Sequence, residues 1–142
     1  LIIFIGYYVF FQFNRIFFHN LLYMNKKYDL EERLISFSVS VIDTIEKLPK
    51  TYIAQYLFKQ VARSSISPTL NYGEAQAAES RKDFVHKLKI VLKELRETKN
   101  ALELIKRKKY IEKNEIQFIQ DECSQLIAIF SKSIETTKSN MD

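Results

Sequence analysis

The chain has 142 residues and a net charge of +5, and it holds only two glycines, two prolines and one cysteine. Its length predicts one domain, and its share of hydrophobic residues, 46%, predicts a globular rather than a disordered chain. So few glycines, with no Asn-Gly or Asp-Gly pair, argue against an all-β fold and against glycine-rich nucleotide-binding loops. A single cysteine excludes a disulfide framework and a multi-cysteine zinc site. We therefore expect a helical, metal-free, cofactor-free domain in the reducing cytoplasm.

Residues 1–23 differ in composition from the rest, because they hold six of the 11 phenylalanines and only one formal charge, Arg15. The first methionine is Met24, so we expect translation to start there, with an apolar leader at 1–23 and the domain at 24–142. The alternative is a membrane segment, which the length allows. Arg15 would then cost ~2.5–3.5 kcal/mol inside the bilayer. Lys26 and Lys27 would hold the following domain on the cytoplasmic side.

The first predicted helix covers residues 30–48. Asp29 is suited to cap its N-terminus, with Glu32 three residues later, and Pro49 should end it. Six apolar side chains recur on one face of this segment at helical spacing. They are Leu30, Leu34, Phe37, Val41, Ile45 and Leu48.

The second predicted helix follows Thr51, a good N-terminal cap, and should close at Gly73 in a left-handed conformation. Its apolar stripe changes to small hydroxyl residues at Ser64 and Ser65. Pro68 lies inside the segment and should kink it, because proline removes one backbone hydrogen bond.

The third predicted helix starts after the capping residue Ser80 and ends in the basic run at 106–109. Its apolar residues follow alternating steps of four and three, which is an unbroken heptad pattern. The heptad positions are Phe84, Leu88, Val91, Leu95, Thr98, Leu102 and Ile105.

The fourth predicted helix begins after Asn114, with Gln117 three residues later, and its polar end after Ile134 should fray. Cys123 lies on its apolar stripe and is expected to be a small buried hydrophobe rather than a nucleophile. Four amphipathic helices with short connections predict an all-α fold, an antiparallel up-down-up-down four-helix bundle.

Positive charge concentrates on the third helix. Residues 81–109 hold eleven Lys and Arg against four Asp and Glu, a balance of +7, which leaves −2 for the rest of the chain. Five of these cations fall within about 60° on a helical projection, opposite the heptad. They are Lys82, Lys89, Lys93, Arg96 and Arg107, called here the basic stripe. The stripe could be an ordinary solvated face, a row that follows nucleic-acid phosphates, or a surface for an acidic protein partner.

The second and third helices resemble a family of four-helix bundle proteins that includes proteins encoded in intervening sequences of 23S ribosomal RNA genes. The resemblance rests on the stretches 60–74, 78–84 and 92–97 and covers roughly residues 30–134. A relative of this family is the accessory protein of diversity-generating retroelements. One local departure is that Gly73 precedes Glu74, whereas many members place the glycine after the glutamate. Five polar residues match the family pattern, namely Gln60, Arg63, Ser67, Asn71 and Glu74.

The resemblance implies a ring-like homopentamer with a basic surface, no catalytic activity and a role with nucleic acid. The five motif residues are expected to cap or bridge helices, and Arg63 with Glu74 could equally form an ion pair between subunits.

Two functions follow from the sequence. The first is a non-catalytic, oligomeric module that binds RNA or DNA through the basic stripe. The alternative is a structural or protein-interaction bundle whose basic face docks a neighbouring protomer or an acidic partner such as a reverse transcriptase. No small-molecule substrate is expected. An enzymatic function is the least favoured interpretation. Asp83 and His86 form one Asp-x-x-His pair, whereas a bundle with a di-metal site needs two such motifs.

Overall fold

The structure is a computed structural model that describes residues 29–140, so the predicted leader and the start at Met24 lie outside the described residues. The chain divides into two compact units, Leu1–Arg33 and Leu34–Asp142. The second unit holds the helical bundle, and the described part of the first is the start of its first helix.

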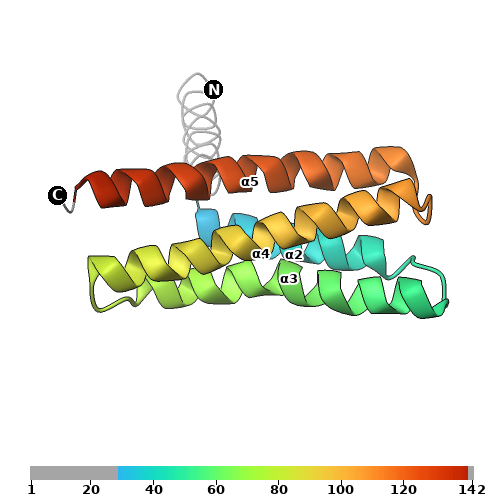
Figure 1. The fold of residues 1–142 in the computed structure, drawn as a ribbon, viewed down its shortest axis with the longest axis horizontal. Helices are drawn as coiled ribbons and strands as arrows, with labels where there is room; N and C mark the ends of the chain where they lie inside the picture. The colour runs from blue at the N-terminus through green and yellow to red at the C-terminus, as the bar shows by residue number, and fades with distance from the viewer. Residues whose placement is uncertain (1–28, 141–142) are drawn as a thin grey trace, which may run out of the picture. The chain divides into compact units, whose positions relative to one another are not determined.

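Four α-helices make up the described residues, namely α2 at Leu30–Ile45, α3 at Tyr52–Gln76, α4 at Arg81–Arg107 and α5 at Lys113–Ser139. Consecutive helices run in opposite directions, as Figure 1 shows. Helix α4 packs against both α3 and α5. Helix α2 completes the bundle, because Ser38 contacts α3 and Thr44 contacts α5. The predicted all-α, antiparallel four-helix bundle is confirmed. None of the helices within 29–140 has the length and apolar character needed to cross a membrane.

Three predicted N-terminal caps are confirmed. Asp29 Oδ1 accepts hydrogen bonds from the backbone N–H groups of Glu31 and Glu32 at 3.1 and 3.2 Å. Thr51 Oγ1 accepts from Ala54 N at 3.4 Å, and Ser80 Oγ accepts from Asp83 N at 3.1 Å. Each cap satisfies a backbone donor that the helix leaves without a partner, so short-range sequence signals fix these three starts.

The predicted helix end at Gly73 is wrong. Helix α3 runs unbroken through Pro68 and Gly73 to Gln76, and no glycine among the described residues has a positive φ. Continuing the helix buries Ala75, which is 2% exposed, and this burial favours the longer helix.

The predicted start of the last helix at Asn114 is also wrong. Helix α5 begins at Lys113 after Glu112, whose side chain makes no capping hydrogen bond. In its first turn Glu115 accepts hydrogen bonds from Thr44 and Lys47. Contacts with α2 therefore position this helix start.

Two further helix ends differ from the expected ones. The first helix stops at Ile45, three residues before Leu48, and the chain then tightens through a hydrogen bond from Leu48 N to Ile45 O. The last helix continues past Ile134 to Ser139, where Arg81 donates a hydrogen bond to the Asn140 carbonyl. The second difference involves a contact between α4 and the end of α5, which a local sequence pattern does not encode.

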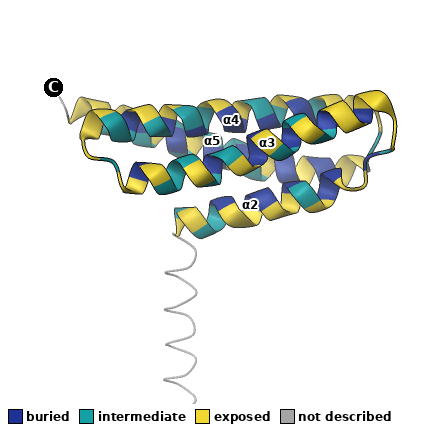
Figure 2. Cartoon of the chain, turned by 90° about the horizontal axis from the view of Figure 1, so that it is seen from below, coloured by how far each residue is buried: buried dark blue, intermediate teal, exposed yellow. Residues whose placement is uncertain are grey.

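The apolar stripes form the core, and Figure 2 shows buried residues on the faces that the helices turn toward one another. In α4, Phe84 is half buried, and Val85 takes its place in the core. The other six heptad positions of α4 are buried as predicted. They are Leu88, Val91, Leu95, Thr98, Leu102 and Ile105.

Small hydroxyl residues occupy the middle of the core, where α2, α3 and α4 meet. Ser38 Oγ lies 2.7 Å from the Ser65 carbonyl oxygen and 3.1 Å from Thr69 Oγ1. Thr98 Oγ1 donates to Ser64 Oγ at 2.8 Å. Because these buried hydroxyls have partners, they cost little to bury and they hold the three helices in one register.

Candidate nucleic-acid interface

The basic stripe lies on the outer face of α4, and all five of its side chains are exposed. An α-helix rises 1.5 Å per residue, so Lys82 and Arg96 lie about 21 Å apart along the axis. Lys89 lies between them, at about half that distance. The Ser80 cap and the buried heptad hold α4 in place, so the cations project from a rigid element.

Four of the five stripe cations have no ion-pair partner among residues 29–140. Within residues 29–140, Lys82, Lys89, Lys93 and Arg96 make no ion pair, whereas Arg63 of α3 and Lys132 of α5 bind carboxylates. The fifth, Arg107, donates to Glu103 one helical turn earlier at 2.7 Å. The stripe therefore has a free part at 82–96 and a neutralised end at Arg107.

Two carboxylates of α4, those of Glu94 and Glu97, are held by Arg63 of α3. The Arg63 guanidinium donates to Glu97 Oε1 at 2.5 Å and to Glu94 Oε2 at 3.4 Å. The hydrogen bond to Glu97 and the charge of Glu94 raise the pKa of Arg63 above its ordinary value. Glu94 is 5% exposed, so its negative charge is shielded from solvent next to α3. Glu94 and Glu97 therefore face α3, on a different side of α4 from the free stripe cations.

A second ion pair joins the same two helices, because Lys87 of α4 donates to Glu74 of α3. The hydrogen bond from the ammonium to Glu74 raises the pKa of Lys87 above its ordinary value. Arg63 and Glu74 each have a partner within their own chain, so their pairing across subunits has no support in this structure. Both residues bridge α3 to α4 within the chain.

The other family-motif residues have local roles. Asn71 donates to the carbonyl oxygen of Ser67 at 3.0 Å and to its Oγ at 3.1 Å, across one turn of α3 that includes Pro68. Gln60 is half buried on the same helix. The motif therefore builds the α3–α4 contact and the turn around Pro68.

The side chains considered for catalysis are far from reactive arrangements. Cys123 is fully buried and donates to the Leu95 carbonyl oxygen at 3.3 Å, and burial raises its pKa to about 12. A thiol with this pKa is not a nucleophile at neutral pH. His86 is exposed on α4. Within residues 29–140, no group of three or more His, Cys, Asp or Glu side chains could hold a metal ion.

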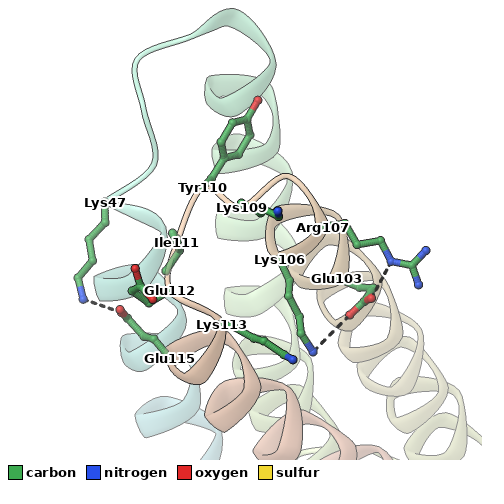
Figure 3. A pocket seen from close by; sticks show the side chains of 10 residues that line it. All are labelled: Lys47, Glu103, Lys106, Arg107, Lys109, Tyr110, Ile111, Glu112, Lys113 and Glu115. Atoms are coloured by element: carbon green, nitrogen blue, oxygen red, sulfur yellow. Dashed lines mark hydrogen bonds and ion pairs between the residues drawn. The ribbon is translucent and has the colours of Figure 1, made fainter.

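A hollow of about 680 Å³ lies where α4 turns into α5, beside the end of α2 (Figure 3). Sequence reasoning did not identify it, although the run at 106–109 marks its position. Ion pairs neutralise part of its charge, because Glu103 holds Lys106 and Arg107 and Glu115 holds Lys47. Gln120 and Arg107 donate to Glu103 and lower the pKa of that carboxyl. The lining cations are Lys47, Lys106, Arg107, Lys109 and Lys113.

Comparison with known proteins identifies similar chains. A family model described as 23S rRNA-intervening sequence protein matches residues 26–132. Among solved structures, a protein of unknown function from the S23 ribosomal protein family of Bacteroides thetaiotaomicron superposes with a TM-score of 0.68 at 31% sequence identity. The superposition covers 73% of this chain and 96% of that chain. A search of curated proteins found no match.

Proposed function

The chain belongs to the 23S rRNA-intervening sequence protein family, and on that premise we propose that it is a non-catalytic, homo-oligomeric bundle that binds the phosphate backbone of RNA or DNA through α4. The family match confirms the resemblance seen in the motif at 60–74. The function itself is our proposal, and the single observation that carries it is the set of four exposed, unpaired cations at 82–96.

The physical reason is counterion release. Each Lys or Arg that neutralises a phosphate frees a condensed cation from the nucleic acid, and that release favours binding. A cation already bound to a carboxylate gains less, because it must first give up its partner. Arg63 and Arg107 are bound in this way, so Lys82, Lys89, Lys93 and Arg96 are the contributing residues.

The spacing of the free cations matches the spacing of phosphates along a nucleic-acid backbone. One strand of a duplex advances about 3.4 Å per phosphate, so the ~21 Å from Lys82 to Arg96 spans about six phosphates. The stripe contains no aromatic side chain, so stacking on bases is not expected. Binding should therefore depend on charge and helix shape, with little dependence on base sequence.

An oligomer strengthens this function. Each protomer contributes one stripe, and stripes that act together on one nucleic acid raise the effective affinity without any new contact. The family resemblance implies five copies in a ring, and we include this homopentamer in the proposal. The raised pKa and full burial of Cys123 support the non-catalytic part of the proposal.

The test compares two triple variants of the full chain at one moderate salt concentration. In the first, Lys89, Lys93 and Arg96 are changed to Gln, which keeps helix propensity and leaves the heptad untouched. The control changes Lys50, Lys113 and Lys138 to Gln, three exposed lysines that make no ion pair within residues 29–140. Both variants lose the same charge, so only the position of that charge differs.

Fluorescence anisotropy with labelled duplex RNA and DNA measures the affinity. We expect the stripe variant to bind at least about tenfold more weakly than the control, because three phosphate contacts are lost. Equal affinities of the two variants would remove the stripe from the proposed function. Loss of the oligomer in the stripe variant, measured by light scattering, would instead place the stripe against a neighbouring protomer.

A further inference from the structure

The hollow at the turn from α4 to α5 has the size of a small-ligand site. Its volume of about 680 Å³ lies inside the ~300–1,000 Å³ range of pockets that hold small molecules. The last turn of α4, the connection at 109–112 and the first turn of α5 form most of its wall, and Lys47, which follows α2, completes it (Figure 3). The hollow therefore lies where three segments distant in the sequence meet.

Positive charge predominates in this hollow. Five cations and three carboxylates line it, which is a balance of +2. Two of the carboxylates, Glu103 and Glu115, already accept hydrogen bonds from other side chains of the protein. The third, Glu112, makes no ion pair within residues 29–140, and in Figure 3 it lies on the same side of the hollow as Glu115.

Two lysines of the hollow have no carboxylate partner. Lys109 and Lys113 are exposed, and neither makes an ion pair within residues 29–140. In Figure 3 the Lys113 side chain points toward Lys106 across the hollow. Arg107 also keeps free donors, because its Nε–H binds Glu103 while its Nη groups make no ion pair in the described part of the chain.

The backbone at Lys109 is strained. Its φ is 56°, the only positive φ of a non-glycine residue within residues 29–140. Lys109 N–H donates to the Lys106 carbonyl oxygen, and Tyr110 N–H donates to that of Ile105, which is the helix ending that usually has glycine at this position. A side chain disfavours this φ, whereas glycine adopts it freely. The lysine therefore costs stability here and adds a cation to the hollow.

A phosphate monoester matches the hollow in charge and size. It carries about −1.5 to −2 at pH 7, whereas a phosphate inside a strand carries about −1, so the monoester is closer to the balance of +2. Ammonium and guanidinium groups bind phosphate oxygens through strong, charge-assisted hydrogen bonds. Tyr110 and Ile111 are half buried in the wall of the hollow and offer apolar surface to the sugar or base that carries the phosphate.

We propose that the hollow binds a terminal phosphate through Lys109, Lys113 and Arg107. The ligand is a phosphate monoester, either at the end of a nucleic-acid strand or on a free nucleotide. The inference goes beyond the proposed function, because the free cations at 82–96 do not line the hollow. Arg107 is the one residue that belongs to both the basic stripe and the hollow.

The test compares two double variants of the full chain that lose the same charge. The hollow variant, Lys109→Gln with Lys113→Gln, removes the two lysines without a carboxylate partner. The matched control is Lys59→Gln with Lys138→Gln, two exposed lysines that do not line the hollow and make no ion pair within residues 29–140. Circular dichroism checks that both variants fold.

Two pairs of ligands separate the two sources of the phosphate. Isothermal titration calorimetry compares adenosine monophosphate with adenosine. Fluorescence anisotropy compares one 3′-labelled RNA strand made with a 5′-phosphate or with a 5′-hydroxyl. In at least one pair, the phosphate should strengthen binding to the unmodified chain and to the control by at least about tenfold. The hollow variant should lose this preference. A preference in the calorimetric pair identifies a free nucleotide, and a preference in the RNA pair alone identifies a strand end.

Lys109→Gly separates binding from folding. Glycine suits the φ of 56°, so this variant should have a higher Tm than the unmodified chain. It should also bind the terminal phosphate about threefold more weakly or worse, because one cation is lost. Weaker binding by a more stable protein does not come from unfolding. A lower Tm would contradict the strain at Lys109.

Equal binding of the phosphorylated and unphosphorylated ligands by the unmodified chain would overturn the proposal. A phosphate preference that persists in the hollow variant would overturn it as well. The stripe variant, with Lys89, Lys93 and Arg96 changed to Gln, should bind RNA more weakly and still prefer the 5′-phosphate. Failure of the stripe therefore changes the overall RNA affinity, and failure of the hollow changes the preference for a terminal phosphate, so the two results are distinct.

Discussion

At the scale of single residues, side-chain partners decide what each group does. Cys123 is fully buried and its thiol donates to the Leu95 carbonyl oxygen, and Arg63 joins α3 to α4 because two carboxylates bind it. The residue types were readable from the sequence, and so was the burial of Cys123. The partners of Arg63 were not, because Glu94 and Glu97 follow it by 31 and 34 residues and meet it only through the packing of α3 on α4.

Gly73 provides the first prediction at this scale. It lies inside α3 without a positive φ, and a Cβ atom added there meets nothing within 4 Å. We expect Gly73→Ala to raise the free energy of unfolding by about 0.5–1 kcal/mol, because alanine has less backbone entropy to lose in a helix. Urea denaturation measures the change. A loss of stability would contradict the open surroundings of Gly73.

The ion pair between Lys47 and Glu115 provides a pH prediction. The hydrogen bond from the Lys47 ammonium, at 2.5 Å, lowers the pKa of Glu115 below its ordinary value of 4.5. A depressed carboxyl pKa contributes stability that is present above the ordinary value and is lost as the pH falls through the lowered one. Glu115→Gln should therefore reduce the fall in Tm between about pH 5 and pH 3.

The control for this prediction is Glu46→Gln, an exposed glutamate of α2 without an ion pair within residues 29–140. It should leave the acid dependence of Tm unchanged. Identical pH profiles for Glu115→Gln and the unmodified chain would show that the pair adds nothing to stability.

At the scale of helices, local signals succeeded where the determining contacts are local. The caps at Asp29, Thr51 and Ser80 and the heptad of α4 were predictable, because each depends on residues within a few positions. The ends at Gly73 and Asn114 were mispredicted, because burial of Ala75 and the contact of Glu115 with α2 override the local signals.

Leu95 tests the register of α4. It is fully buried in the middle of the heptad, so Leu95→Ala should lower the free energy of unfolding by ~2–5 kcal/mol through lost burial and the cavity left behind. Leu104 on the same helix is 54% exposed, and Leu104→Ala should change stability by no more than about 0.5 kcal/mol. Chemical denaturation gives both values. A loss under about 1 kcal/mol at Leu95 would contradict the assigned register.

At the scale of the whole molecule, the distribution of charge separates a structural side of α4 from a candidate functional side. The five stripe positions were predictable from helical periodicity, and all five are exposed. Which of them remain free was not predictable, because it depends on Glu94 and Glu97 turning toward Arg63 and on Glu103 binding Arg107. The hollow at the α4–α5 turn was missed for a similar reason, since α2 contributes Lys47 to it.

The salt dependence of nucleic-acid binding tests the central claim most directly, because it counts the phosphates that the protein neutralises. The logarithm of affinity should fall linearly with the logarithm of salt concentration, by about 0.9 per phosphate on duplex DNA and about 0.7 on single strands. Changing Lys89, Lys93 and Arg96 to Gln should lower this slope by about two to three units while the stability stays unchanged. An unchanged slope in that variant would contradict the assignment of the α4 stripe to phosphate binding.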